Sequence, residues 1–205
     1  MFLSKVFIPQ RGSSNNYSLH QKLWSLFPDR PDAARDFLFR VEQHQRGIGT
    51  YILMQSLLEP VSEQGVEVIG SKQFALGFHH GQALRFMLKA NPTKTIKDPT
   101  KGTVARDGKN FTRTTRVPLV DEDEQHAWLA RKLENAAYLQ VVTSRKEMPI
   151  YFRKPGTKQS GKIQPVCFDG VIELTDPEVF KEVYVKGIGR AKAFGCGMLS
   201  LARAK

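Results

Sequence analysis

Residues 176–202 read DPEVFKEVYVKGIGRAKAFGCGMLSLA, and this stretch predicts a helix, a glycine-rich loop and a strand in direct succession. Asp176 and Pro177 are typical of an N-cap followed by a first helical residue. Gly187 predicts the end of that helix, because glycine adopts the backbone conformations that stop a helix. The apolar residues 198–202 predict a strand. The chain therefore closes with a helix and a strand that belong to one unit.

The first half of the chain predicts a strand, a helix and two further strands. These elements are the strand 2–8, the helix 17–27, and the strands 35–43 and 49–56. Farther on, residues 71–78 and 83–90 flank the turn HHGQ and predict two strands that pair with each other. The intervening segment from Pro60 to Gly70 is rich in β-branched residues and glycine. This half therefore lacks a clear second helix.

The second half predicts the same order of elements. A strand at 115–120 precedes a helix at 121–140, whose first residues are acidic and whose apolar face contains Leu129 and Leu133. Strands at 151–154 and 163–174 then lead into the closing helix and strand. Two β-α-β-β-α-β units predict an α+β fold of tandem ferredoxin-like domains, with antiparallel sheets and helices on one face. The predicted organisation is an N-terminal domain at 1–95, a basic linker at 96–114 and a C-terminal domain at 115–205.

The charge of the chain favours a polyanionic partner. Lys and Arg number 31 against 20 Asp and Glu, and the formal net charge is +11. Residues 93–116 contain seven basic and two acidic side chains. Residues 144–162 place six basic side chains near Tyr151 and Phe152, and cations beside stacking rings suit nucleic acid. The alternative for both stretches is a solvated loop.

Composition argues against several other classes of protein. Cys167 and Cys196 stand far apart, without a CxxC motif or a histidine at metal-ligand spacing, so we expect buried thiols and no metal or other cofactor. The opening residues MFLSKVFI are too short and mixed for a signal peptide, and no segment has the roughly 18 apolar residues of a membrane span. We therefore expect a cytoplasmic protein without membrane contact.

The string GIGRAKAFGCG at 187–197 fits none of three familiar phosphate or RNA motifs. A dinucleotide-binding loop needs a preceding strand and a third glycine where Lys192 stands. A P-loop needs Gly-Lys followed by Ser or Thr, and an RRM strand needs an aromatic residue where Ile188 stands. A glycine-rich loop that approaches phosphates and a plain turn both remain open.

The chain as a whole resembles the CRISPR-associated repeat-processing endoribonucleases, and among them the CasE type. The resemblance lies in FLSKV, YSLHQKLWSLFPDRPDAARDFLFRVE, KANPTKTI, SGKIQPVCFDG, the two G-x-G units of the glycine-rich loop, and GCGMLSLA. It implies tandem ferredoxin-like domains and metal-independent cleavage at the 3′ base of a CRISPR repeat hairpin. It also implies that the enzyme retains the crRNA and joins the other subunits of the Cascade complex.

The resemblance also implies a set of site residues. The catalytic histidine falls on His20 and the active-site tyrosine on Tyr17. An RNA-contacting hairpin contains Lys158 and Lys162, and the basic side chains Arg153 and Lys154 lie in the same stretch. The RNA-binding glycine-rich loop contributes Gly187, Gly189, Arg190, Lys192, Gly195 and Gly197.

The residues themselves are compatible with this chemistry. RNA carries its own nucleophile in each 2′-hydroxyl, so its cleavage needs a proton acceptor, a proton donor and positive charge, and histidine suits proton transfer near neutral pH. Tyr17, His20 and Trp24 lie along the margin of the predicted helix, where Trp24 is expected to pack. His20 could instead be a packed histidine that bonds a backbone carbonyl. A non-catalytic subunit that binds an RNA hairpin, and a general nucleic-acid-binding module, are the alternative functions.

Overall fold

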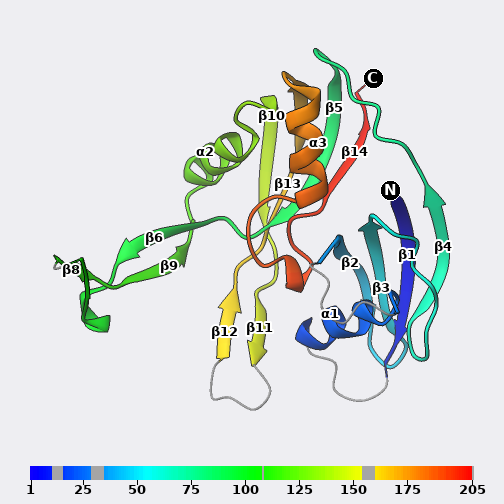
Figure 1. Cartoon of the computed structure of the whole chain (residues 1–205), viewed down its shortest axis with the longest axis horizontal. Helices are drawn as coiled ribbons and strands as arrows, with labels where there is room; N and C mark the ends of the chain where they lie inside the picture. The colour runs from blue at the N-terminus through cyan, green and yellow to red at the C-terminus, as the bar shows by residue number, and fades with distance from the viewer. Residues whose placement is uncertain (11–15, 29–34, 108, 154–159, 205) are drawn as a thin grey trace.

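The computed structural model describes residues 1–10, 16–28, 35–107, 109–153 and 160–204, without the side chains of residues 16, 17, 106, 109 and 153. Its N-terminal unit is a four-stranded antiparallel sheet with one helix (Figure 1). The strands, in the order β2-β3-β1-β4, are β1 (Phe2–Pro9), β2 (Phe37–Gln45), β3 (Gly49–Ser56) and β4 (Glu67–Gln73). This order is that of a ferredoxin-like sheet.

Helix α1 (Asn16–Trp24) covers one face of this sheet. Leu19 and Leu23 are buried against the strands, and each such side chain stabilises the fold by about 1.5–3 kcal/mol. Trp24 packs against the same core, with its ring 5.2 Å from that of Phe37, so the prediction that it packs is confirmed. Residues 57–66 contain no helix, and β4 pairs directly with β1. The first unit therefore lacks the second helix, as the sequence indicated.

The C-terminal unit repeats this topology in full. The sheet has the order β10-β13-β5-β14 and is crossed by two helices on one face. Its elements are β5 (Ala83–Ala90), α2 (Glu122–Leu133), β10 (Ala137–Lys146), β13 (Val166–Leu174), α3 (Pro177–Lys186) and β14 (Leu199–Arg203). Asp176 caps α3 by accepting from the backbone N–H groups of Glu178 and Val179, and α3 ends at Gly187 as predicted. The tandem ferredoxin-like α+β fold is thus confirmed.

The structure corrects three predicted elements. Residues 71–78 and 83–90 do not pair, because β4 pairs with β1 whereas β5 pairs with β13 and β14. The helix predicted at 121–140 ends at Leu133, because Asn135 adopts a left-handed conformation, and β10 follows. The first strand of the second unit is therefore β5. The predicted first strand at 115–120 belongs to a separate ribbon.

The basic stretch from residue 93 onward forms an ordered arm that projects from the body (Figure 1). The arm consists of β6 (Thr93–Lys97) paired with β9 (Thr114–Pro118), and of η1 (Pro99–Lys101), β7 (Thr103–Arg106) and β8 (Lys109–Thr112) at its tip. It is an insertion between β5 and α2. The chain thus changes from one sheet to the other between β4 and β5, before the arm, whereas the predicted first domain extended to residue 95.

Buried polar contacts join the two units. Arg40 on β2 is 6% exposed and donates from Nη1 to the Ser200 hydroxyl at 2.7 Å. Gln55 on β3 donates to the Tyr184 carbonyl of α3 at 3.1 Å. Buried polar groups that are satisfied in this way fix one relative placement of the sheets. None of the described helices is long and apolar enough to cross a membrane.

Candidate active site and nucleic-acid interface

His20 lies on α1 where that helix meets both units. Its ring stands over the aromatic side chains of β2, with centroids 5.7 Å from Phe37 and 6.5 Å from Phe39. Helix α1 also packs against η2 (Lys192–Phe194) of the glycine-rich loop and against β11 (Ile150–Arg153). The predicted catalytic residue therefore lies at the junction of the units.

The His20 imidazole is half-buried and incompletely hydrogen-bonded. Its Nε2 atom is buried and has no hydrogen-bond partner among the described residues. The packed alternative predicts a bond to a backbone carbonyl, and among the described residues Nε2 makes none. Burial, and then the positive charge of Arg35, lower the pKa of His20 below its ordinary 6.5. A buried polar atom without a partner is uncommon and calls for an explanation.

Several predicted site residues fall outside what the structure describes. Tyr17 belongs to α1 three residues before His20, but its side chain is outside the description, as is that of Arg153. Lys154 and Lys158 lie outside the described residues altogether. These four assignments stay predictions.

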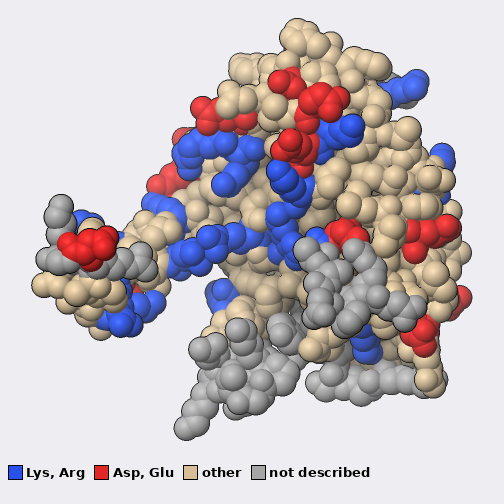
Figure 2. Space-filling model, viewed as in Figure 1, with Lys and Arg blue, Asp and Glu red and all other residues tan. Residues whose placement is uncertain are grey.

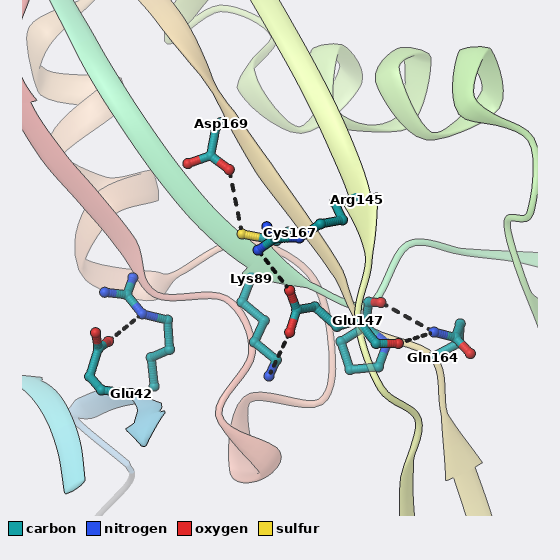
Figure 3. A network of polar contacts seen from close by, with 9 residues as sticks. Glu42, Lys89, Arg145, Glu147, Gln164, Cys167 and Asp169 are labelled. Carbon is teal, nitrogen blue, oxygen red and sulfur yellow. Dashed lines mark hydrogen bonds and ion pairs between the residues drawn. The ribbon is translucent and has the colours of Figure 1, made fainter. Parts of the chain in front are cut away.

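The hairpin of β11 and β12 (Ser160–Ile163) stands on a polar network at its root (Figure 3). Gln164 donates to the Glu147 carbonyl at 2.8 Å, and the Glu147 carboxylate pairs with Arg145 at 3.2 Å and Lys89 at 3.9 Å. These hydrogen bonds and ion pairs connect the two ends of the hairpin to the body of the protein. Lys162 is exposed on it, 5.8 Å from the Tyr151 ring centroid.

The glycine-rich loop is packed tightly between the two units. Gly195 and Gly197 are buried, whereas Gly187 and Gly189 face a groove. A Cβ atom at Gly187 would lie 2.6 Å from Leu38 Cδ1 on β2 and 2.8 Å from the Gly197 carbonyl oxygen. One at Gly197 would lie 2.7 Å from the Ile188 oxygen. At these two positions glycine is required by backbone and side-chain packing.

Gly187→Ala is expected to destabilise the protein by about 2–5 kcal/mol. Gly187 has φ 73° and ψ 158°, a region essentially restricted to glycine, and the added methyl group would overlap Leu38. Gly81→Ala is the matched control, because Gly81 also has positive φ but no atom within 4 Å of its added Cβ. That variant is expected to lose about 1 kcal/mol. Urea unfolding measures both, and equal losses would contradict the packing role.

A basic groove runs past this loop. It consists of two hollows that share Asn91, Thr93, Arg116 and Arg190. We call the combined surface the basic groove. Its cationic lining residues come from the arm, α2, β10, β12, α3 and the loop: Arg116, Lys132, Lys146, Lys162, Lys186, Arg190 and Lys192. Figure 2 shows Lys and Arg gathered over the root of the β6–β9 ribbon and beside α3.

The structure brings part of the predicted RNA-binding set together. Lys162, Arg190 and Lys192 line the basic groove. Sequence reasoning missed Lys132 and Lys186, which helical spacing could have suggested: Lys132 lies four residues after Trp128, and both side chains line the groove. Arg116 was noted only as part of a basic stretch, because the place where the arm joins the body is a tertiary feature.

The remaining histidines have other environments. His44 shares a 2.9 Å hydrogen bond with the Thr50 hydroxyl, and His126 shares one of 3.2 Å with the Ser144 hydroxyl. His79 and His80 are exposed at a turn. Cys167 and Cys196 are buried free thiols, as predicted, and burial raises the pKa of Cys196 to about 12.

These features define a polyanion-binding protein with a tandem ferredoxin-like fold, a basic groove and a half-buried histidine at the junction of its two units. The family described as "CRISPR associated protein" matches residues 1–203. The Cascade subunit CasE of Escherichia coli K12 is 48% identical over 98% of this chain and 99% of its own. The endoribonuclease Cse3 of Thermus thermophilus is 31% identical over 98% of this chain and its whole length.

Solved structures similar to this chain come from the same family of proteins. The crystal structure of Cas6e from E. coli K-12 has a TM-score of 0.84 at 45% identity, with both chains covered completely. A structure of the CRISPR endoribonuclease Cse3 bound to a 19-nucleotide RNA has a TM-score of 0.75 at 28% identity and covers 98% of this chain and all of the other. This chain belongs to the CRISPR-associated protein family and, within it, to the CasE type.

Proposed function

We propose that this protein is a cytoplasmic endoribonuclease that cleaves CRISPR precursor RNA at the 3′ base of the repeat hairpin and retains the crRNA for the Cascade complex. The observation that carries the proposal is the Nε2 atom of His20, which has no hydrogen-bond partner among the described residues and lies at the junction where α1 meets the glycine-rich loop of the basic groove. The relatives support it, since one bears the name of a Cascade subunit and another that of a CRISPR-associated endoribonuclease.

The reaction uses the nucleophile that RNA supplies. The 2′-oxygen of the scissile nucleotide attacks the adjacent phosphorus and its proton passes to a base, while the bond to the 5′-oxygen breaks and that oxygen receives a proton. The products are a 2′,3′-cyclic phosphate, or the 3′-phosphate derived from it by hydrolysis, and a 5′-hydroxyl. Protein groups can supply both proton transfers and the positive charge that the phosphorane requires.

His20 is suited to the base role. Because burial and Arg35 lower its pKa, the neutral imidazole predominates at pH 7 and can accept the 2′-hydroxyl proton. Trp24, Phe37 and Phe39 pack against the ring. We propose that Tyr17, one helical turn away, orients or stabilises the same phosphate.

The basic groove provides the binding surface for the hairpin. Phosphates along an RNA backbone attract Lys and Arg regardless of base, and the groove offers such side chains from both the arm and the loop. The carboxylate of Glu182, which also lines it, is paired with Lys186 at 2.8 Å. The β11–β12 hairpin carries Lys162 at the other end of this surface.

Purified protein incubated with end-labelled repeat RNA in EDTA is expected to cut it once, at the 3′ base of the stem. In the proposed reaction the cations of the groove supply the positive charge and His20 accepts the proton, so we expect no requirement for a divalent ion. Gel analysis identifies the cut, and added Mg²⁺ is expected to leave the rate unchanged. A repeat with a scrambled stem is the control substrate. Tight binding without cleavage would instead establish a non-catalytic hairpin-binding subunit, and equal binding of the scrambled stem a general nucleic-acid-binding module.

A further inference from the structure

Arg35 lies two residues before the start of β2, in the same unit as His20. Phe37 and Phe39, two and four residues farther on, have their rings against the His20 imidazole. Arg35 is itself half-buried, and its Nε atom is buried without a hydrogen-bond partner among the described residues. A guanidinium is always charged and offers five donors, so a buried Nε–H that is left unbonded calls for an acceptor.

Lys192 approaches the same place from the other unit. It belongs to η2, which packs against both α1 and β2. Its ammonium group donates to the Lys186 carbonyl at 2.5 Å, which uses one of its three donors and leaves two. Lys192 also lines the basic groove, so the groove extends to the loop segment that packs against α1.

The charges that shift the pKa values of His20 and Lys192 are all positive. Arg35 lowers the pKa of both His20 and Lys192, and Lys132 lowers that of Lys192 further. Burial is the larger cause in each case. Cations gathered in a half-buried place repel one another, and an anionic ligand removes that repulsion.

We propose that Arg35 and Lys192 together bind the non-bridging oxygens of the scissile phosphate and stabilise the negative charge that the phosphorane develops there. This proposal rests on the proposed ribonuclease function. Both units then contribute to the catalytic site, since Arg35 precedes β2 of the first unit and Lys192 lies in the loop of the second. An arginine suits the role because its planar fork matches two phosphate oxygens.

The experiment compares Arg35→Gln, Arg35→Lys and Lys192→Gln with the wild-type protein in single-turnover cleavage of the repeat hairpin. Each glutamine variant is expected to cleave about 10²–10³-fold more slowly, as when one preorganised donor to a transition state is removed. Affinity for an uncleavable hairpin with a 2′-deoxy scissile nucleotide is expected to change by less than about tenfold, because the other cations of the groove remain. Arg35→Lys is expected to recover part of the rate.

Two readouts separate phosphate binding from a structural role. Arg35→Gln removes a positive charge beside His20, so the pKa seen in the pH–rate profile is expected to rise toward 6.5. The double variant Arg35→Gln, Lys192→Gln is expected to cleave more slowly than either single variant. Its fold-reduction in rate is expected to be smaller than the product of the two single fold-reductions, because both side chains act on one phosphate. Arg46→Gln, which changes an exposed arginine of the same unit, is the matched control and is expected to cleave at the wild-type rate.

The outcomes distinguish this inference from the function on which it rests. If the wild-type protein does not cut the repeat, the proposed function fails. If the wild-type protein cuts and both glutamine variants cut at the wild-type rate, Arg35 and Lys192 do not bind the scissile phosphate. The same conclusion follows if Arg35→Gln is slow but its pH–rate profile is unchanged and Arg35→Lys recovers none of the rate. Should Arg35 variants fail to fold, a Lys192→Gln variant with the wild-type rate overturns the proposal by itself.

Discussion

His20→Ala is expected to slow single-turnover cleavage of the repeat hairpin by about 10²–10⁴-fold, the usual contribution of a positioned proton-transfer group. Affinity for the hairpin is expected to stay within a few fold of wild type, because the cations that line the basic groove are unchanged. Quantifying product by gel at enzyme excess gives the rate, and filter binding gives the affinity.

Two variants make that result specific. Alanine leaves a space between Trp24, Phe37 and Phe39, so His20→Gln, which fills more of it but carries no titratable group, is expected to be equally slow with less loss of thermal stability. His79→Ala removes an exposed histidine at a turn and is expected to cleave normally. Full activity of the His20→Gln variant would take this residue out of the chemistry.

A single 2′-deoxy substitution at the scissile nucleotide is expected to abolish cleavage while the hairpin still binds. The proposed reaction has no other nucleophile: without the 2′-oxygen there is nothing for His20 to deprotonate, and no cyclic phosphate can form. Binding rests on the phosphates, which the substitution leaves in place. Time courses of product formation measure the first effect, and competition with unmodified hairpin measures the second.

The position of the substitution supplies the control. A 2′-deoxy nucleotide one position upstream or downstream of the cut is expected to leave the rate within about tenfold of the unmodified RNA. Cleavage of the substrate that lacks the scissile 2′-hydroxyl, with a water-derived product end, would show that a hydrolytic mechanism operates instead. The same series tests whether the cut lies at the 3′ base of the stem.

Local chemistry made much of the site predictable. The Asp176 cap, the Gly187 stop and the packing of Trp24 depend on residues close in sequence, and the structure confirms them. His20 was identified through the resemblance of its helix to that of the family. The structure adds that its Nε2 atom has no hydrogen-bond partner in the described part of the chain, which helical spacing alone could not reveal.

The pairing of strands that are distant in sequence was less predictable. The residues of β5 predict a strand, but its partners β13 and β14 lie far away in sequence. An apolar alternation specifies that a segment forms a strand and which face is buried, and it carries little information about the neighbouring strand. The sequence interpretation paired β5 with the strand just before it, and so began the second unit too late.

By itself, the sequence determined the order of most elements, the missing helix of the first unit, the positive charge and the histidine, because helix caps, periodicity and composition act over a few residues. Only the tertiary structure decided that α1, the start of β2 and η2 pack together, which brings His20, Arg35 and Lys192 to one junction, and that the glycines of the loop at 187–197 allow the two units to approach closely. Those decisions rest on contacts between residues far apart in the chain, such as those of α1 and η2, which form only when two separately encoded sheets dock.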